Sequence, residues 1–115
     1  MKRGDVALAV FPNTDGLTAK LRPVVFVQAV GLDTGLPQVL VAMVTSNLRR
    51  AGKTFRFFVA VDGVPGRASG LLSDSVVMAD CLATISTKAV HRIIGSLEKA
   101  PLDGALRAAL GLQYI

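Results

Sequence analysis

Short apolar runs separated by turn-forming residues dominate the chain, and this pattern predicts a β-rich protein. Many of the runs are rich in β-branched residues, which pack well on a pleated sheet. The segments between them are dense in Gly, Pro, Asn and Asp, which favour turns. The pieces that we expect to be extended are Val6–Phe11, Pro23–Val30, Val39–Thr45, Phe55–Val61, Gly70–Leu72, Val76–Ala79, Leu82–Ile85 and Arg92–Leu97.

The end of the chain follows a helical period instead. Pro101 suits the start of a helix and Gly111 suits its stop. The apolar positions that fall on one face between them are Leu102, Ala105, Leu106, Ala109 and Leu110. A single helical turn is also expected over Ser86–Val90. About six short strands and one final helix predict a compact, largely antiparallel barrel. Without repeats or linkers, residues 1–115 form one expected domain.

Composition favours a folded protein that associates with itself. Hydrophobic residues make up 51% of the 115 residues and charged residues 18%, which is enough apolar material for a core. A surplus of apolar surface in so small a chain favours a homodimer. No run reaches the roughly 18 apolar residues that span a bilayer, and Met1–Asp5 does not open a signal peptide. We therefore expect a cytoplasmic protein without membrane segments.

Charge and reactive residues narrow the chemistry. The net charge is +5 and the isoelectric point is near 10, so nucleic acid, anionic lipid and an acidic protein are all candidate partners. Cys81 and His91 are the only residues of their types. That excludes an intrachain disulfide, leaves too few ligands for a zinc site, and weakens any Ser-His-Asp or Cys-His arrangement. We expect no cofactor, a structural or surface role for His91, and a buried, unreactive Cys81.

Several short motifs along the whole chain resemble those of the MazF/PemK toxins of type II toxin–antitoxin systems. These segments are Lys2–Val6 ("KRGDV"), Phe11–Pro12 with Thr14–Gly16 ("FP-TDG"), Leu21–Val24 ("LRPV"), Val44–Ser46 ("VTS"), Gly70–Leu72 with Asp74–Val77 ("GLL" and "DSVV"), Thr84–Ile85 ("TI") and Leu110–Leu112 ("LGL"). Each motif is weak alone, but they occur in order and at suitable spacing.

The resemblance implies a fold, an activity and partners. The fold would be the MazF/PemK/CcdB type, a small SH3-like antiparallel barrel with a C-terminal helix, working as a homodimer. The activity would be sequence-specific, metal-independent cleavage of single-stranded RNA. In that reaction the 2′-hydroxyl attacks the adjacent phosphate and leaves a cyclic phosphate and a 5′-hydroxyl. The implied partner is a small acidic, MazE-like antitoxin.

The resemblance also implies an active site. It places a catalytic arginine just before the second strand and a threonine at the end of the third, which here are Arg22 and Thr45. The arginine fork matches two phosphate oxygens, and guanidinium stays protonated, so electrostatic stabilisation is its expected role. Asp80 is a candidate contributor, although PemK-like members carry an arginine two residues earlier, where this chain has Met78.

A basic cluster after the third strand is a candidate RNA-binding segment, because it could neutralise backbone phosphates. A solvated loop is the alternative. The residues that we expect to bind RNA are Lys20, Ser46, Arg49, Arg50, Lys53 and Arg56.

Three other functions stay open on the sequence. CcdB-type gyrase poisons are thought to share this fold, but they end in Trp-Gly-Ile, whereas this chain ends Leu112-Gln113-Tyr114-Ile115 and has no Trp. A catalytically inactive relic that binds only RNA or antitoxin is the second alternative. A plain structural domain is the third.

Overall fold

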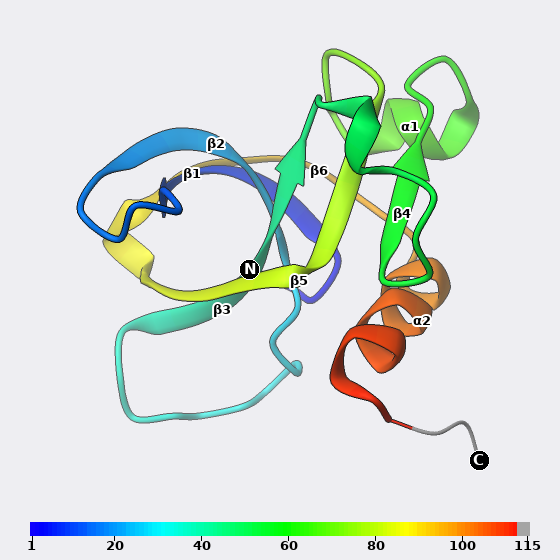
Figure 1. Cartoon of the computed structure of the whole chain (residues 1–115). Helices are drawn as coiled ribbons and strands as arrows, with labels where there is room; N and C mark the ends of the chain where they lie inside the picture. The colour runs from blue at the N-terminus through cyan, green and yellow to red at the C-terminus, as the bar shows by residue number, and fades with distance from the viewer. Residues whose placement is uncertain (113–115) are drawn as a thin grey trace.

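The chain folds into a curled antiparallel sheet with a helix at its C-terminal end (Figure 1). The structure is a computed structural model that describes residues 1–112. Within them, six strands lie in the order β4-β5-β3-β2-β1-β6. The strands are β1 (Asp5–Pro12), β2 (Ala19–Phe26), β3 (Gln38–Thr45), β4 (Arg56–Val59), β5 (Ser75–Ser86) and β6 (Val90–Ser96). The helices are η1 (Leu48–Arg50), α1 (Val64–Ala68), η2 (Thr87–Ala89) and α2 (Lys99–Leu110). The chain end Gln113–Ile115, which bears on the gyrase-poison alternative, lies outside the described residues.

The two faces of the sheet each bury an apolar cluster, which explains why the strands are apolar at nearly every position. On β2, Val24 and Phe26 belong to one cluster, while Val25 and, just after the strand, Val27 belong to the other. Alternate residues of a strand point to opposite faces, so such a strand carries two cores. Leu102 of α2 is fully buried in the second cluster, so the helix covers that face.

The C-terminal helix is confirmed close to its predicted bounds. It ends at Gly111, whose φ of 69° is left-handed and whose N–H donates to the Arg107 carbonyl. Leu102 and Ala105 of the predicted apolar face are buried, whereas Leu110 at the end of the helix is exposed. The helical turn expected around residue 88 is also present, as η2. Among the described residues, no helix is both long and apolar enough to cross a membrane.

The second strand begins earlier than predicted, at Ala19 instead of Pro23, and ends at Phe26. A tight hairpin with β1 is the reason, because the ladder runs from Val6↔Val25 to Pro12↔Ala19 and recruits polar residues that propensity assigns to a loop. The extended piece predicted over residues 70–72 is wrong. Gly70 lies in a turn with φ 73°, and its N–H donates to the Arg67 carbonyl.

Two further predicted pieces, residues 76–79 and 82–85, are parts of one strand, β5. The ladder with β3 is interrupted between them: Ala42 pairs with Leu82, but the next residue, Met43, pairs with Met78. The three extra residues on β5 form an irregularity, and such interruptions bend a strand. The bend accounts for the polar Asp80 in an otherwise apolar run, since that residue is exposed.

Candidate functional site

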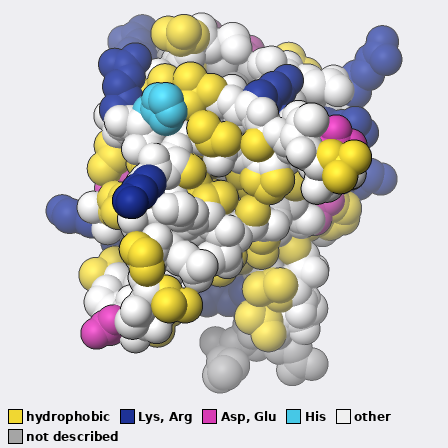
Figure 2. Space-filling model, turned by 90° about the vertical axis from the view of Figure 1, so that its left-hand side faces the viewer, with side chains coloured by type: hydrophobic (Ala, Val, Ile, Leu, Met, Phe, Trp, Pro, Cys, Tyr) yellow, Lys and Arg dark blue, Asp and Glu magenta, His cyan; other side chains and the backbone are white. Residues whose placement is uncertain are grey.

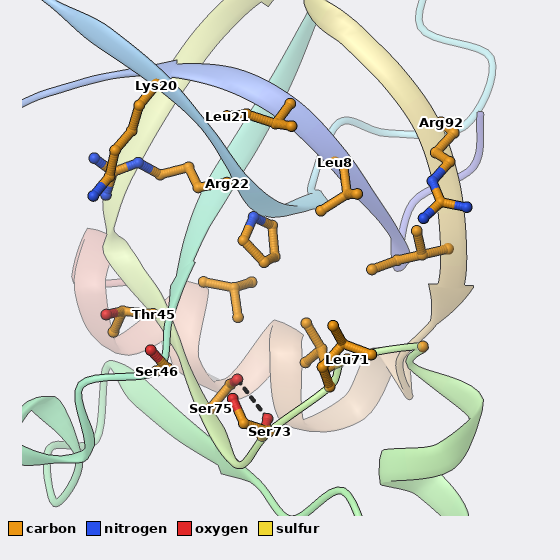
Figure 3. Close-up of a pocket in the computed structure, with 15 residues that line it drawn as sticks. Leu8, Lys20, Leu21, Arg22, Thr45, Ser46, Leu71, Ser73, Ser75 and Arg92 are labelled. Atoms are coloured by element: carbon orange, nitrogen blue, oxygen red, sulfur yellow. Dashed lines mark hydrogen bonds between the residues drawn. The ribbon is translucent and has the colours of Figure 1, made fainter.

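A cavity of about 360 Å³ opens where strands β2 and β3 diverge (Figure 3). The β2–β3 ladder ends at the pair Val24↔Met43. Pro23, the next residue of β2, has no N–H with which to extend a ladder. Arg22, two residues before Val24, and Thr45, two residues after Met43, both line the cavity at this end of the ladder. The two predicted catalytic residues therefore lie at one site, just beyond the end of the β2–β3 ladder.

The lining of this cavity is cationic and apolar. Lys20 and Arg22 lie along one side of it, the side on which Thr45 and Ser46 also lie, and Arg92 of β6 lies at the other side (Figure 3). No carboxylate is found among the described residues that line it. The complete lining is Leu8, Lys20, Leu21, Arg22, Pro23, Val44, Thr45, Ser46, Gly70, Leu71, Leu72, Ser73, Ser75, Arg92 and Ile94. Such a lining suits a ligand that is both anionic and apolar.

The guanidinium of Arg22 is held by neutral groups. One terminal nitrogen donates to Sδ of Met43 at 3.1 Å, and the other donates to Oδ1 of Asn13. Its Nε is buried and has no acceptor among the described residues. Because neither partner is an anion, the positive charge of Arg22 is not neutralised by an ion pair, and it stays available to an incoming phosphate.

A chain of hydrogen bonds in the β1–β2 loop fixes Asn13 in turn. Nδ2 of Asn13 donates to Oγ1 of Thr18 at 2.8 Å, and that hydroxyl donates to Oδ2 of Asp15 at 2.7 Å. Backbone N–H groups of Leu17 and Thr18 also donate to Asp15. The Thr18 hydroxyl and these N–H groups lower the pKa of Asp15. The loop thus orients the Asn13 amide so that its oxygen faces Arg22.

Hydroxyl groups line part of the site. Oγ1 of Thr45 accepts the Asn47 N–H at 3.1 Å, which leaves the hydroxyl proton for a ligand in the cavity. Ser75 is buried, and its hydroxyl donates to the Ser73 carbonyl at 2.8 Å. The start of β5 and the turn before it therefore place a backbone carbonyl and side-chain hydroxyl groups along the lower part of the view in Figure 3.

The predicted basic cluster lies apart from this cavity. Arg49, Arg50, Lys53 and Arg56 do not line it, and neither does Asp80. Arg56 donates to both carboxylate oxygens of Asp80, at 3.2 and 2.8 Å, and to the Arg50 carbonyl at 3.3 Å. Hydrogen bonding from Arg56 lowers the pKa of Asp80. In this structure the two residues tie the loop to β5, whereas Arg49 and Arg50 are exposed on η1.

The structure adds residues to the site that the sequence did not single out. Arg92, Ser73 and Ser75 line the cavity, and Asn13 holds Arg22. Arg92 reads as an ordinary polar position at the start of an apolar run, and Asn13 reads as a turn former, so no local signal marks either one. Only the β1–β6 pairing, in which Leu8 lies beside Arg92, brings the last strand to the cavity.

Cys81 and His91, the only cysteine and the only histidine in the sequence, do not line the cavity. Cys81 is half-buried against the first apolar cluster, and burial raises the pKa of its thiol, which makes it a poor nucleophile. His91 is exposed on β6 and does not line the cavity. Within residues 1–112, no three His, Cys, Asp or Glu side chains gather as they would to hold a metal ion.

Several solved structures resemble this chain over nearly its full length. A Mycobacterium tuberculosis toxin MazF-mt6 is 26% identical with a TM-score of 0.74, covering 96% of this chain and 99% of that chain. A mycobacterial endoribonuclease in complex with its cognate antitoxin is 19% identical with a TM-score of 0.73, covering 100% and 99%. MazF in a MazE–MazF complex from Deinococcus radiodurans is 20% identical with a TM-score of 0.68, covering 98% and 97%.

The sequence itself carries the family assignment. None of the curated proteins compared with the chain matches it. Residues 2–111, however, match the family of PemK-like, MazF-like toxins of type II toxin–antitoxin systems. That match spans the whole sheet, α2, and every residue that lines the cavity. The MazF-like fold and the match over residues 2–111 together establish that the chain belongs to the PemK-like, MazF-like toxins of type II toxin–antitoxin systems.

Proposed function

We propose that the protein is an endoribonuclease toxin that cleaves single-stranded RNA at particular sequences. The observation that carries the proposal is that Arg22 and Thr45 line one cationic cavity, in whose described lining no carboxylate is found. The similarity to a mycobacterial endoribonuclease supports it. RNA supplies its own nucleophile, the 2′-hydroxyl. The protein therefore has to align the reacting groups and stabilise the transition state, and no side chain has to attack the phosphate.

The reaction is a transfer within the RNA strand. The 2′-oxygen forms a bond to the adjacent phosphorus while the bond to the 5′-oxygen breaks, which yields a 2′,3′-cyclic phosphate and a 5′-hydroxyl. The 2′-hydroxyl loses its proton to solvent, and the leaving 5′-oxygen takes one up. Arg22 stabilises the charge that gathers on the phosphorane oxygens, and Thr45 adds a neutral donor. A donor fixed in place in this way contributes about 3–4 kcal/mol to the transition state.

A cognate acidic, MazE-like antitoxin is the partner that fits this surface. The chain carries a net charge of +5. The cavity gathers Lys20, Arg22 and Arg92 without an acidic neighbour in its described lining. An acidic segment lying over the cavity would compete directly with RNA phosphates for these cations. The solved complexes of similar toxins with their antitoxins support this reading.

The first test concerns metal. Since the RNA supplies the nucleophile and Arg22 supplies the charge, the purified protein should cut a mixture of single-stranded RNAs in excess EDTA as fast as with magnesium. The measurement is gel analysis of end-labelled RNA, with 5′-hydroxyl ends checked by phosphorylation with a polynucleotide kinase. Loss of cleavage in EDTA and its return with magnesium would refute the proposed mechanism.

We also propose that the toxin is a homodimer. Large apolar side chains outside the cavity stay exposed on the single chain, among them Ile93 of β6, which is 46% exposed. Figure 2 shows hydrophobic side chains gathered over the middle of one face, with lysines and arginines around its edge. An apolar centre with a charged rim is typical of a subunit interface.

Sedimentation equilibrium tests this assembly. Each chain has a mass of 12.0 kDa, so the protein at micromolar concentration should sediment with twice that mass. Replacing Ile93 with aspartate places a charge among the exposed apolar side chains and should shift the protein towards monomer. The unchanged protein sedimenting as a monomer at that concentration would contradict the dimer.

A further inference from the structure

We propose that Asn13 is a positioning residue for Arg22, and that Asp15 acts through Thr18 to keep the amide oxygen of Asn13 turned towards the guanidinium. The four residues form one relay, in which each group fixes the hydrogen-bonding direction of the next. Its effect is that Arg22 is held by a neutral acceptor, so that its charge is left for a phosphate. The inference rests on the proposed function, because it concerns how Arg22 meets RNA.

Asn13 provides the strongest anchor of the Arg22 side chain. Val24, two residues further along β2, belongs to the first apolar cluster, so Arg22 extends from that same face of the sheet. Figure 3 shows the Arg22 side chain extending away from Leu8. One terminal nitrogen reaches Sδ of Met43 at 3.1 Å, but a thioether is only a weak acceptor. The Asn13 oxygen is therefore the one strong acceptor that the described residues offer to the guanidinium.

The direction of the relay starts at the Asp15 carboxylate. The Thr18 hydroxyl and two backbone N–H groups lower the pKa of Asp15, so the carboxyl is ionised near neutral pH and can only accept hydrogen bonds. The single hydroxyl proton of Thr18 is therefore donated to Oδ2 of Asp15, at 2.7 Å, and the hydroxyl oxygen has to accept from Asn13. Only the NH₂ end of an amide donates, which leaves the carbonyl end of Asn13 towards Arg22.

The backbone of the β1–β2 loop gives the relay a fixed frame. The Asn13 N–H donates to the Thr18 carbonyl at 2.8 Å, and the Gly16 N–H donates to the Asn13 carbonyl at 3.2 Å. Gly16 has a left-handed φ of 72°, which suits the turn between them. Asp15 and Thr18 are exposed, so their side chains belong to no apolar core. We therefore expect substitutions there to change the placement of Arg22 without unfolding the sheet.

A neutral acceptor matters because an anion would use up the charge that RNA needs. Arg22 has no ion pair with any residue that the structure describes. A carboxylate in place of the Asn13 amide would form an ion pair with the guanidinium and would compete directly with a phosphate for it. The relay places Thr18 and Asn13 between the carboxylate of Asp15 and Arg22. The carboxylate thus sets the direction of the hydrogen bonds without neutralising Arg22.

The first arm of the experiment replaces Asn13 and measures single-turnover cleavage of single-stranded RNA. Asn13→Ala should slow cleavage at saturating RNA roughly tenfold, since a loosely held Arg22 is in place only part of the time. Asn13→Asp has nearly the same shape and keeps an acceptor oxygen, so a merely structural Asn13 would tolerate it. The relay instead predicts that Asn13→Asp binds RNA more weakly than Asn13→Ala and loses about 0.7 of the salt slope. Thermal unfolding provides the folding control.

The second arm tests the relay beyond Asn13. Thr18→Val keeps the shape of the side chain but removes the hydroxyl, so it should slow cleavage as Asn13→Ala does. Thr18→Ser restores a hydroxyl and should recover most of the rate. Thr34→Val removes the hydroxyl of another exposed loop threonine, which does not line the cavity, and should cleave as the unchanged protein does. In an Arg22→Ala background, Thr18→Val and Asn13→Ala should each change cleavage by less than about twofold, as expected of residues that act through Arg22.

A readout that needs no cleavage separates the relay from the proposed function. Nitrogen NMR of arginine side chains reports how freely a guanidinium rotates. The terminal nitrogens of Arg22 should give separate signals in the unchanged protein and merged signals in Asn13→Ala and Thr18→Val. Separate signals in both variants, or an Asn13→Asp protein that binds and cuts RNA normally, would overturn the relay while cleavage stands. If the protein cuts no RNA but the Arg22 signals merge in both variants, the proposed reaction fails and the relay survives.

Discussion

Arg22→Ala is expected to lower single-turnover cleavage of RNA by roughly a hundredfold or more, with RNA affinity changed much less. The reason is that the proposed contact strengthens as charge develops on the phosphate, so its loss raises the barrier. Arg22→Lys should recover little, because a point charge does not reproduce the planar fork that Met43 and Asn13 orient. Thermal unfolding serves as the folding control, since Arg22 is half-buried.

A triple variant of the loop after β3 provides the contrast. Replacing Arg49, Arg50 and Lys53 with alanine should weaken RNA binding and flatten its salt dependence, by up to about 0.7 of slope for each phosphate contact that is lost. Cleavage at saturating RNA should persist, because these residues do not line the cavity. Near-normal cleavage by Arg22→Ala, together with a failed chemical step in the loop variant, would move the active site to that loop.

Gly70→Ala is expected to destabilise the fold by about 2–5 kcal/mol. Gly70 has φ +73°, and a Cβ placed on it would lie 2.0 Å from the carbonyl oxygen of Ile94 on β6. The left-handed backbone costs an alanine about 1–2 kcal/mol, and forcing an atom into a packed site costs about 1–3 kcal/mol more. Denaturant unfolding followed by circular dichroism measures the loss. Total stabilities of only about 5–15 kcal/mol make this change a large one.

Gly35→Ala is the matched control. Gly35 has nearly the same backbone, φ +72°, but a Cβ there would meet no atom within 4 Å. It should therefore show only the left-handed cost of about 1–2 kcal/mol. Equal losses in the two variants would show that the approach of the residue 70 turn to β6 does not constrain the fold. The prediction matters for function because this turn carries Leu71 and Ser73 to the cavity.

Local pattern was sufficient to predict the class of the fold. The β-branched runs became strands, and the apolar period between Pro101 and Gly111 became α2, since both patterns are set by residues a few positions apart. The pattern failed where a partner strand mattered. Polar residues 19–22 joined β2 because β1 lies beside them, and residues 70–72 became a turn because β6 lies beside that segment.

The residues of the candidate site likewise fall into those that the sequence predicted and those that only the structure revealed. Family resemblance led from the sequence to Arg22 and Thr45, because each lies within a short recognisable motif, and the structure sets them at one cavity. Their catalytic roles stay predictions until the variants are measured. The basic run at residues 49–56 was predicted from the sequence to bind RNA together with the site. A local density of charge, however, does not reveal where the side chains lie relative to the cavity. Its Arg56 instead engages Asp80.

Sequence by itself thus determined the fold class, the family and two candidate catalytic residues, because these depend on residues close together in the chain. Tertiary structure alone decided which cations share a cavity and which neutral group orients Arg22. Arg92 is 70 positions from Arg22 in the chain, yet both residues line one cavity because β1 pairs with β2 on one side and with β6 on the other. Pairing between strands distant in sequence depends on the register and curl of the whole sheet. No local pattern encodes that arrangement.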